Sequence, residues 1–94
     1  MVTINIAGFL TDFTGGLHVI GLGARPRTVS EALGELWQLH PGLRDRVLTE
    51  QGHVRMHVNV FLDKENIRRK ELLETQIPET CEITILPSVS GGLS

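Results

Sequence analysis

A single amphipathic helix between two sets of strand patterns is the feature that most limits the folds open to this chain. The segment Thr28–Glu31 has the composition of a capping box, and Pro41-Gly42 ends the helix that follows. Such a helix buries its apolar stripe against a second layer, so we expect a helix over 29–40 that packs on a sheet. Gly34, inside this helix, is interpreted as a site of close packing on that sheet. The stripe consists of residues at helical spacing: Val29, Leu33, Leu36, Trp37 and Leu39 or His40.

The residues before the helix predict a hairpin. Val2, Ile4 and Ile6 alternate with smaller or polar residues, which is the pattern of a half-buried strand. Residues 11–16 are rich in turn formers, including two adjacent glycines. A second strand is therefore expected over residues 17–23, paired with the first.

The residues after the helix predict further strands. From Val54 to Val60 apolar and polar side chains alternate, so we expect a strand with one wet face, on which Arg55 points outward. A turn over 61–66 leads to a short strand at 67–69. The last strand spans 81–86, with Ile83 and Ile85 on one face.

The order of strand, strand, helix, strand, short strand and strand is typical of one α+β architecture, the β-grasp fold. This fold is a mixed sheet of four to five strands with one main helix packed on one face. A split βαβ sandwich needs a second full helix, and the short polar segment 70–76 does not supply one. We expect one β-grasp domain over residues 1–87 and a flexible C-terminal tail over 88–94, because the tail residues are small and uncharged.

Composition and charge narrow the classes of function. The 94 residues suffice for one domain, and 40% of them are hydrophobic. Nine basic and 11 acidic residues give a net charge of −2, so no nucleic-acid partner is expected. No apolar run is long enough for a membrane span, no signal peptide is indicated, and the one cysteine fits a reducing compartment. These features favour a cytoplasmic protein without a membrane partner.

Reactive side chains form no convincing catalytic or metal-binding constellation. In the predicted strand, His53 and His57 would share a face roughly 13 Å apart, too far to chelate one ion. His18 and His40 have no carboxylate or cysteine at ligand spacing. Cys81 has no neighbouring base and is interpreted as a structural or surface thiol. We therefore predict no metal site, no cofactor and no catalytic residue in this chain, which would not be an enzyme.

The second half of the chain carries a family resemblance. The segment Val58-Asn59-Val60-Phe61-Leu62-Asp63 leads through two short segments to Glu82-Ile83-Thr84-Ile85-Leu86-Pro87, and the chain then reaches Gly91-Gly92. A strand that ends in proline ahead of a diglycine resembles the MoaD/ThiS family of ubiquitin-like sulfur carriers. The helix with its Pro41-Gly42-Leu43 exit resembles that family as well, so the resemblance covers nearly the whole chain.

The resemblance implies a function for the tail. An adenylating enzyme would use ATP to activate the Gly92 carboxylate, and the product would become a thiocarboxylate. A sulfur-accepting synthase would then take the sulfur for the biosynthesis of molybdopterin, thiamine, cysteine or another metabolite. Gly91 and Gly92 would let the tail enter a recessed nucleotide site, and an extended chain from Pro87 to Gly92 reaches roughly 20 Å.

Two residues depart from the family pattern, in which the small carriers usually end on the second glycine. Here Leu93-Ser94 follow Gly92, so a carrier function requires a peptidase, with a tail-trimming metallopeptidase as the candidate. The alternatives are a ubiquitin-like modifier conjugated to a target lysine through Gly92, and a β-grasp binding module without this chemistry.

Docking on an activating enzyme would use the sheet face away from the helix. The candidate contacts are two apolar residues out of phase with the core, Phe9 and Leu86, together with Phe61 at a strand end; the alternative for all three is partial burial at the rim of the core.

Overall fold

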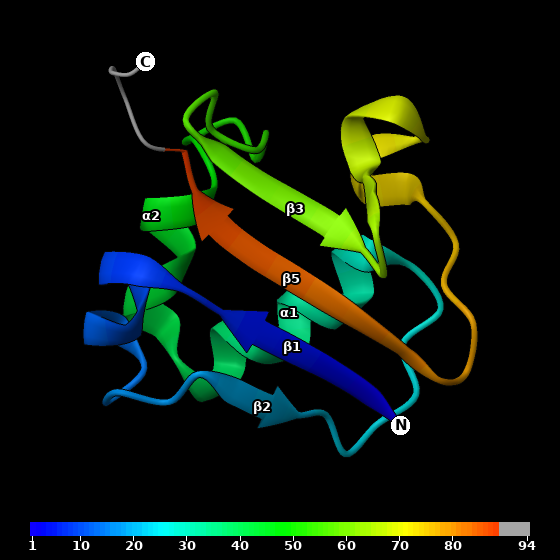
Figure 1. Cartoon of the computed structure of the whole chain (residues 1–94), viewed down its shortest axis with the longest axis horizontal. Coiled ribbons are helices and arrows are strands. Elements are labelled where there is room, and N and C mark those ends of the chain that lie inside the picture. The colour runs from blue at the N-terminus through cyan, green and yellow to red at the C-terminus, as the bar shows by residue number, and fades with distance from the viewer. Residues whose placement is uncertain (89–94) are drawn as a thin grey trace.

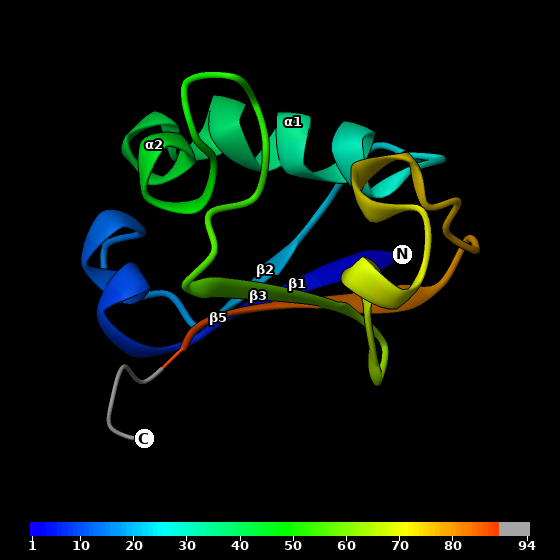
Figure 2. The same cartoon turned by 90° about the horizontal axis from the view of Figure 1, so that it is seen from above.

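The first and last strands of the chain lie side by side in the centre of the sheet (Figure 1). The computed structural model describes residues 1–88. Its five strands are ordered β2-β1-β5-β3-β4, and only β1 and β5 are parallel. Helices α1 and α2 cover one face of this sheet (Figure 2). This is the predicted α+β, β-grasp arrangement, and its elements are β1 (Val2–Ile6), β2 (Val19–Gly21), α1 (Val29–Leu39), α2 (Arg44–Val47), β3 (Val58–Leu62), β4 (Glu65–Asn66) and β5 (Cys81–Pro87).

Strand register sorts the side chains onto two faces. Ile6 and Val60 both lie opposite Ile85, and all three are buried beneath the helices. One residue earlier on β5, Thr84 lies opposite Phe61, and its row is only half-buried. Because side chains alternate along a strand, this row belongs to the face without helices, which we call the open face.

The capping motif starts α1 as predicted, with one difference. The Glu31 backbone N–H donates to the Thr28 hydroxyl at 3.1 Å, but the Glu31 carboxylate accepts from the backbone N–H of Arg27 rather than that of Thr28. Leu36 is fully buried, whereas Leu39 is 57% exposed, so the buried stripe stops before the helix ends.

The interpretation of Gly34 as a site of close packing is wrong. Outside its own helix backbone and chain neighbours, no atom lies within 4 Å of the place where a Cβ on Gly34 would stand. The glycine therefore faces space that a larger side chain could enter.

The predicted strand over 54–60 begins later than expected. Residue Val54 forms only an isolated bridge to Leu48, Met56 is 93% exposed, and regular pairing starts at Val58. The reason is the partner strand: Val58 already lies opposite Pro87, the last residue of β5. Arg55 does not point freely outward either, because its Nε donates to the carbonyl of Asp45 at 2.8 Å.

Short 3-10 helices replace two predicted elements. Gly8–Phe13 is a 3-10 helix that includes the first half of the turn expected over 11–16, and the second strand, expected over 17–23, spans only Val19–Gly21. Ile67–Arg69 is a 3-10 helix, and the short strand lies just before it as β4. Across residues 1–88, neither α-helix is long and apolar enough to cross a membrane.

Candidate functional site

The candidate site is the root of the tail, where β5 ends beside the beginning of β3 (Figure 1). Pro87 lies opposite Val58, and the backbone N–H of Ser88 donates to the carbonyl of His57 at 2.7 Å. The chain is thus held on the sheet up to Ser88. The predicted acceptor Gly92 and its neighbour Gly91 lie outside the described residues.

On the β1 side, Pro87 packs against Gly8. Gly8 has a φ of +66°, and a Cβ at this position would stand 2.9 Å from Cγ of Pro87. Only glycine combines this backbone conformation with so close an approach. No signal in the sequence marks Gly8, because its partner Pro87 is far away in the chain and no local motif includes the glycine.

On the β3 side, Asn59 contacts Ser88. The Asn59 Nδ2 donates to the Ser88 Oγ at 2.7 Å. The Asn59 Oδ1 accepts from Asn66 Nδ2 at 3.2 Å and from Arg68 Nη1 at 2.9 Å. The second guanidinium nitrogen of Arg68 donates to the carbonyls of Arg55 and Val58 at 2.9 and 3.0 Å. A polar network therefore joins the root of the tail to β3 and to the turn before it.

Of the three predicted docking residues, Leu86 and Phe9 lie near this root, and Phe61 lies further along the sheet, opposite Thr84. Leu86 and Phe61 are half-buried on the open face, where Leu86 lies opposite Asn59 and Phe61 lies two residues further along β3. Phe61 is inside the strand rather than at a strand end. Phe9 is 52% exposed and follows Gly8 in the 3-10 helix that contacts Pro87. The site thus combines the end of β5 with apolar side chains of three elements.

Cys81 lies at the opposite end of β5 from the tail root. Its thiol is in the core, and burial is the main reason that its pKa is raised, with a further contribution from the negative charge of Asp63. Less of the reactive thiolate is therefore present at neutral pH, as expected for a structural thiol. In the part of the chain that the structure describes, no three His, Cys, Asp or Glu residues gather as metal ligands. His53 and His57 do not share a strand, because β3 begins at Val58.

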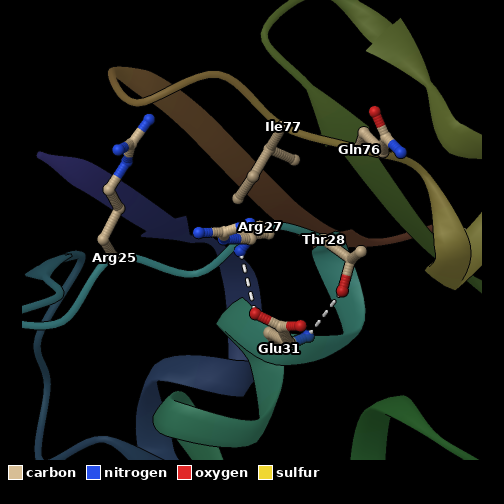
Figure 3. Close-up of a pocket in the computed structure, with 6 residues that line it drawn as sticks. All are labelled: Arg25, Arg27, Thr28, Glu31, Gln76 and Ile77. Atoms are coloured by element: carbon tan, nitrogen blue, oxygen red, sulfur yellow. Dashed lines mark hydrogen bonds between the residues drawn. The ribbon is translucent and has the colours of Figure 1, made fainter.

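A hollow of about 560 Å³ lies at the N-terminus of α1 (Figure 3). In the close-up, the Thr28 hydroxyl accepts a hydrogen bond from the backbone N–H of Glu31, and the Glu31 carboxylate accepts one from the backbone N–H of Arg27. Residues 25–28 are at the other end of the sheet from the tail root in both overall views (Figures 1 and 2). We therefore assign this hollow no part in the candidate site; its lining is Arg25, Arg27, Thr28, Glu31, Gln76 and Ile77.

Comparisons with known proteins agree with this fold. The sulfur carrier protein CysO of Mycobacterium tuberculosis is 29% identical over 93 residues, which cover 97% of this chain and 98% of CysO. A chain in the crystal structure of the Amycolatopsis orientalis BexX/CysO complex has a TM-score of 0.87 and 30% identity, with 98% of this chain and 100% of that chain covered. The solution structure of small archaeal modifier protein 1 from Methanosarcina acetivorans has a TM-score of 0.80 and 28% identity, with 97% and 95% covered.

The family model of the ThiS family matches residues 4–92, a span that runs from β1 through the diglycine. This match confirms the resemblance indicated by the order of strand, proline and diglycine. The chain therefore belongs to the ThiS family of ubiquitin-like β-grasp proteins.

Proposed function

We propose that this protein is a sulfur carrier and that the carboxylate of Gly92 is the group that carries the sulfur. The observation that carries the proposal is the ThiS-family match, because it extends to residue 92. The M. tuberculosis relative that aligns with 97% of the chain is named a sulfur carrier protein, which supports the same function. The position of the tail root at an open end of the sheet is compatible with insertion of the tail into a partner.

The proposed chemistry takes place on partner enzymes. A carboxylate oxygen of Gly92 attacks the α-phosphorus of ATP, and the bond from that phosphorus to pyrophosphate breaks. A sulfur nucleophile at the oxidation level of sulfide then attacks the carbonyl carbon, and AMP leaves with the former carboxylate oxygen. The resulting thiocarboxylate transfers its sulfur to the substrate of a sulfur-accepting synthase. In this scheme the chain is a covalent substrate and not a catalyst.

A peptide bond to Leu93 masks the carboxylate in the chain as written. An amide carbonyl bears no negative oxygen to attack ATP, so removal of Leu93-Ser94 has to precede adenylation. We propose that a peptidase, with a metallopeptidase as the candidate, performs this step. It would act as the switch between the masked and the competent carrier.

We further propose that the activating enzyme docks on the open face beside the tail root. Leu86 and Phe61 offer half-buried apolar surface there, and Phe9 adds an exposed ring near Pro87. A docked partner would cover these side chains and receive the tail in the same orientation. Apolar residues near the centre of a contact contribute most to binding, so their loss should raise KM for the carrier.

The decisive experiment compares two forms of the chain with the adenylating enzyme of the same host. We expect ATP-dependent release of pyrophosphate with a chain that ends at Gly92 and none above background with the 94-residue chain. A Gly92→Ala variant of the shorter form should lose activity and keep its melting temperature, because every described strand and helix precedes it. Equal activity of the two lengths would contradict the masking step.

Intact mass of the protein from its own host provides a second test. We expect loss of Leu93-Ser94, followed by the mass gain that corresponds to the exchange of one oxygen atom for sulfur. A mass that always retains both residues would refute the carrier function as proposed.

A protein modifier conjugated through Gly92 is the second candidate. The similarity to small archaeal modifier protein 1, with a TM-score of 0.80, favours it specifically. This function requires an isopeptide bond between Gly92 and the ε-amine of a lysine on another protein. Peptides that contain this bond, sought by mass spectrometry in host extracts, would distinguish a modifier from a carrier that is used for sulfur alone.

A further inference from the structure

Asn59 is placed where one side chain can control the direction in which the tail leaves the sheet. We infer that Asn59 is a positioning residue: it fixes Ser88, the residue that joins β5 to the tail. The functional consequence of this inference rests on the proposed carrier function. Its structural part rests on the contacts at the tail root alone.

All polar atoms of the Asn59 amide are engaged. Its Oδ1 accepts from both Asn66 and Arg68, so the amide is oriented with Nδ2 toward Ser88. The resulting contact to Ser88 Oγ, at 2.7 Å, lies at the short end of the range for N–H donors. Ser88 is therefore held at two points, through its backbone N–H by His57 and through its hydroxyl by Asn59.

Arg68 holds the amide in place. Its guanidinium donates to Asn59 Oδ1 and to the carbonyls of Arg55 and Val58. These acceptors lie on β3 and on the turn before it, so the guanidinium fixes the orientation of Asn59 relative to the strand that pairs with the end of β5. The planar, multiply donating guanidinium suits this role better than a lysine ammonium would.

The tail root is thus held from both flanks, by Gly8 against Pro87 and by Asn59 against Ser88. A fixed starting point reduces the directions that the following residues can take before they enter a partner. Release of Ser88 adds conformational freedom that has to be lost on binding. The expected cost is in the apparent affinity for the activating enzyme and not in the rate of the chemical step.

The structural part is tested on the full chain by ¹⁵N relaxation. The backbone order parameter of Ser88 should fall from a rigid value of about 0.85 toward about 0.6 in Ser88→Ala and in Asn59→Ala. Ser88→Thr keeps the hydroxyl and should keep the order. Asn59→Asp should keep it as well, because its second carboxylate oxygen can accept from the Ser88 hydroxyl while the first accepts from Arg68.

Asn5→Ala is the matched control, since Asn5 lies on the open face of β1 and donates to Glu82 and Thr84 instead of to Ser88. The Ser88 order parameter should not change in this variant. An equal loss of order at Ser88 in Asn5→Ala would overturn the specific role of Asn59. So would an unchanged order parameter in Ser88→Ala, which leaves the rest of the network untouched and should not affect folding.

The functional part uses the chain that ends at Gly92, which retains every described strand and helix. In Ser88→Ala and Asn59→Ala, the KM for the carrier should rise about 2- to 10-fold while kcat stays unchanged, as expected for one lost hydrogen bond. The KM of the double variant, with Ser88→Ala and Asn59→Ala, should be no higher than that of either single variant. Ser88→Thr should keep the KM of the unsubstituted chain. A fall in order at Ser88 without a change in KM would overturn the positioning role.

Failure of the proposed function would look different. In that case the activating enzyme would release no pyrophosphate from ATP when it is given the unsubstituted chain that ends at Gly92. The relaxation measurement would still decide whether Asn59 orders Ser88.

Discussion

Replacement of Leu36 by alanine should test whether α1 covers the sheet as described. Leu36 is fully buried on the face of α1 that packs against the strands. Its truncation loses transfer free energy and leaves a cavity, which together cost about 2–5 kcal/mol. A chain of this length has a total stability of about 5–14 kcal/mol, so the loss is a large fraction of the whole. The melting temperature should fall by at least about 8 °C.

The matched control is Leu39→Ala, the same substitution on the same helix. Leu39 is 57% exposed, so its truncation should change the free energy of unfolding by less than about 0.5 kcal/mol. Urea unfolding of both variants, followed by circular dichroism, measures the difference. Similar stability of the two variants would refute the assignment of Leu36 to the core and the packing of α1 on the sheet.

Three further predictions concern single positions. Gly34→Ala should raise the free energy of unfolding by about 0.5–1 kcal/mol in urea titrations, because the added methyl group meets no neighbour and alanine favours the helix. Gly8→Ala should lower it by about 1–3 kcal/mol, since the methyl group would be forced against Pro87 at a positive φ; an unchanged stability would mean that the two segments can move apart. The raised pKa of Cys81 means that the unfolded chain releases the thiol proton at a lower pH than the folded chain. Stability should therefore fall as the pH rises through the ordinary pKa of a thiol toward the raised one, and Cys81→Ala should lack this dependence.

Short sequence patterns correctly predicted the start of α1 and the buried face of β1. The Thr28 hydroxyl caps α1 as its spacing predicts, and the alternation of Val2, Ile4 and Ile6 gives the buried face of β1. The alternation over 54–60 predicted a start of β3 that is too early. Val54 and Met56 have the pattern of a strand but no strand to pair with. A strand extends only as far as a neighbouring strand pairs with it, and the alternation in a sequence does not show how long that neighbour is.

The candidate site was predictable in outline only. The diglycine follows from the motif and the open-face position of Leu86 from alternation, whereas Phe61 was expected at a strand end and lies inside β3. The contact between Asn59 and Ser88 joins residues 29 positions apart, and Gly8 meets Pro87 across almost the whole chain. Such contacts arise from the register between β5 and its neighbours, which no local pattern specifies.

Because the last strand, β5, lies in the middle of the sheet, the sheet can form only when the chain includes β5. β5 lies between β1 and β3, and side chains of β1 and β5 that touch are 79 residues apart in sequence. A chain interrupted before Cys81 would lack the middle of its sheet and would leave two strand edges open, a state prone to aggregation. A chain without β5 therefore cannot form the five-stranded sheet. The strand that completes the sheet is also the strand that leads into the tail, so a chain that has folded contains the root of the tail.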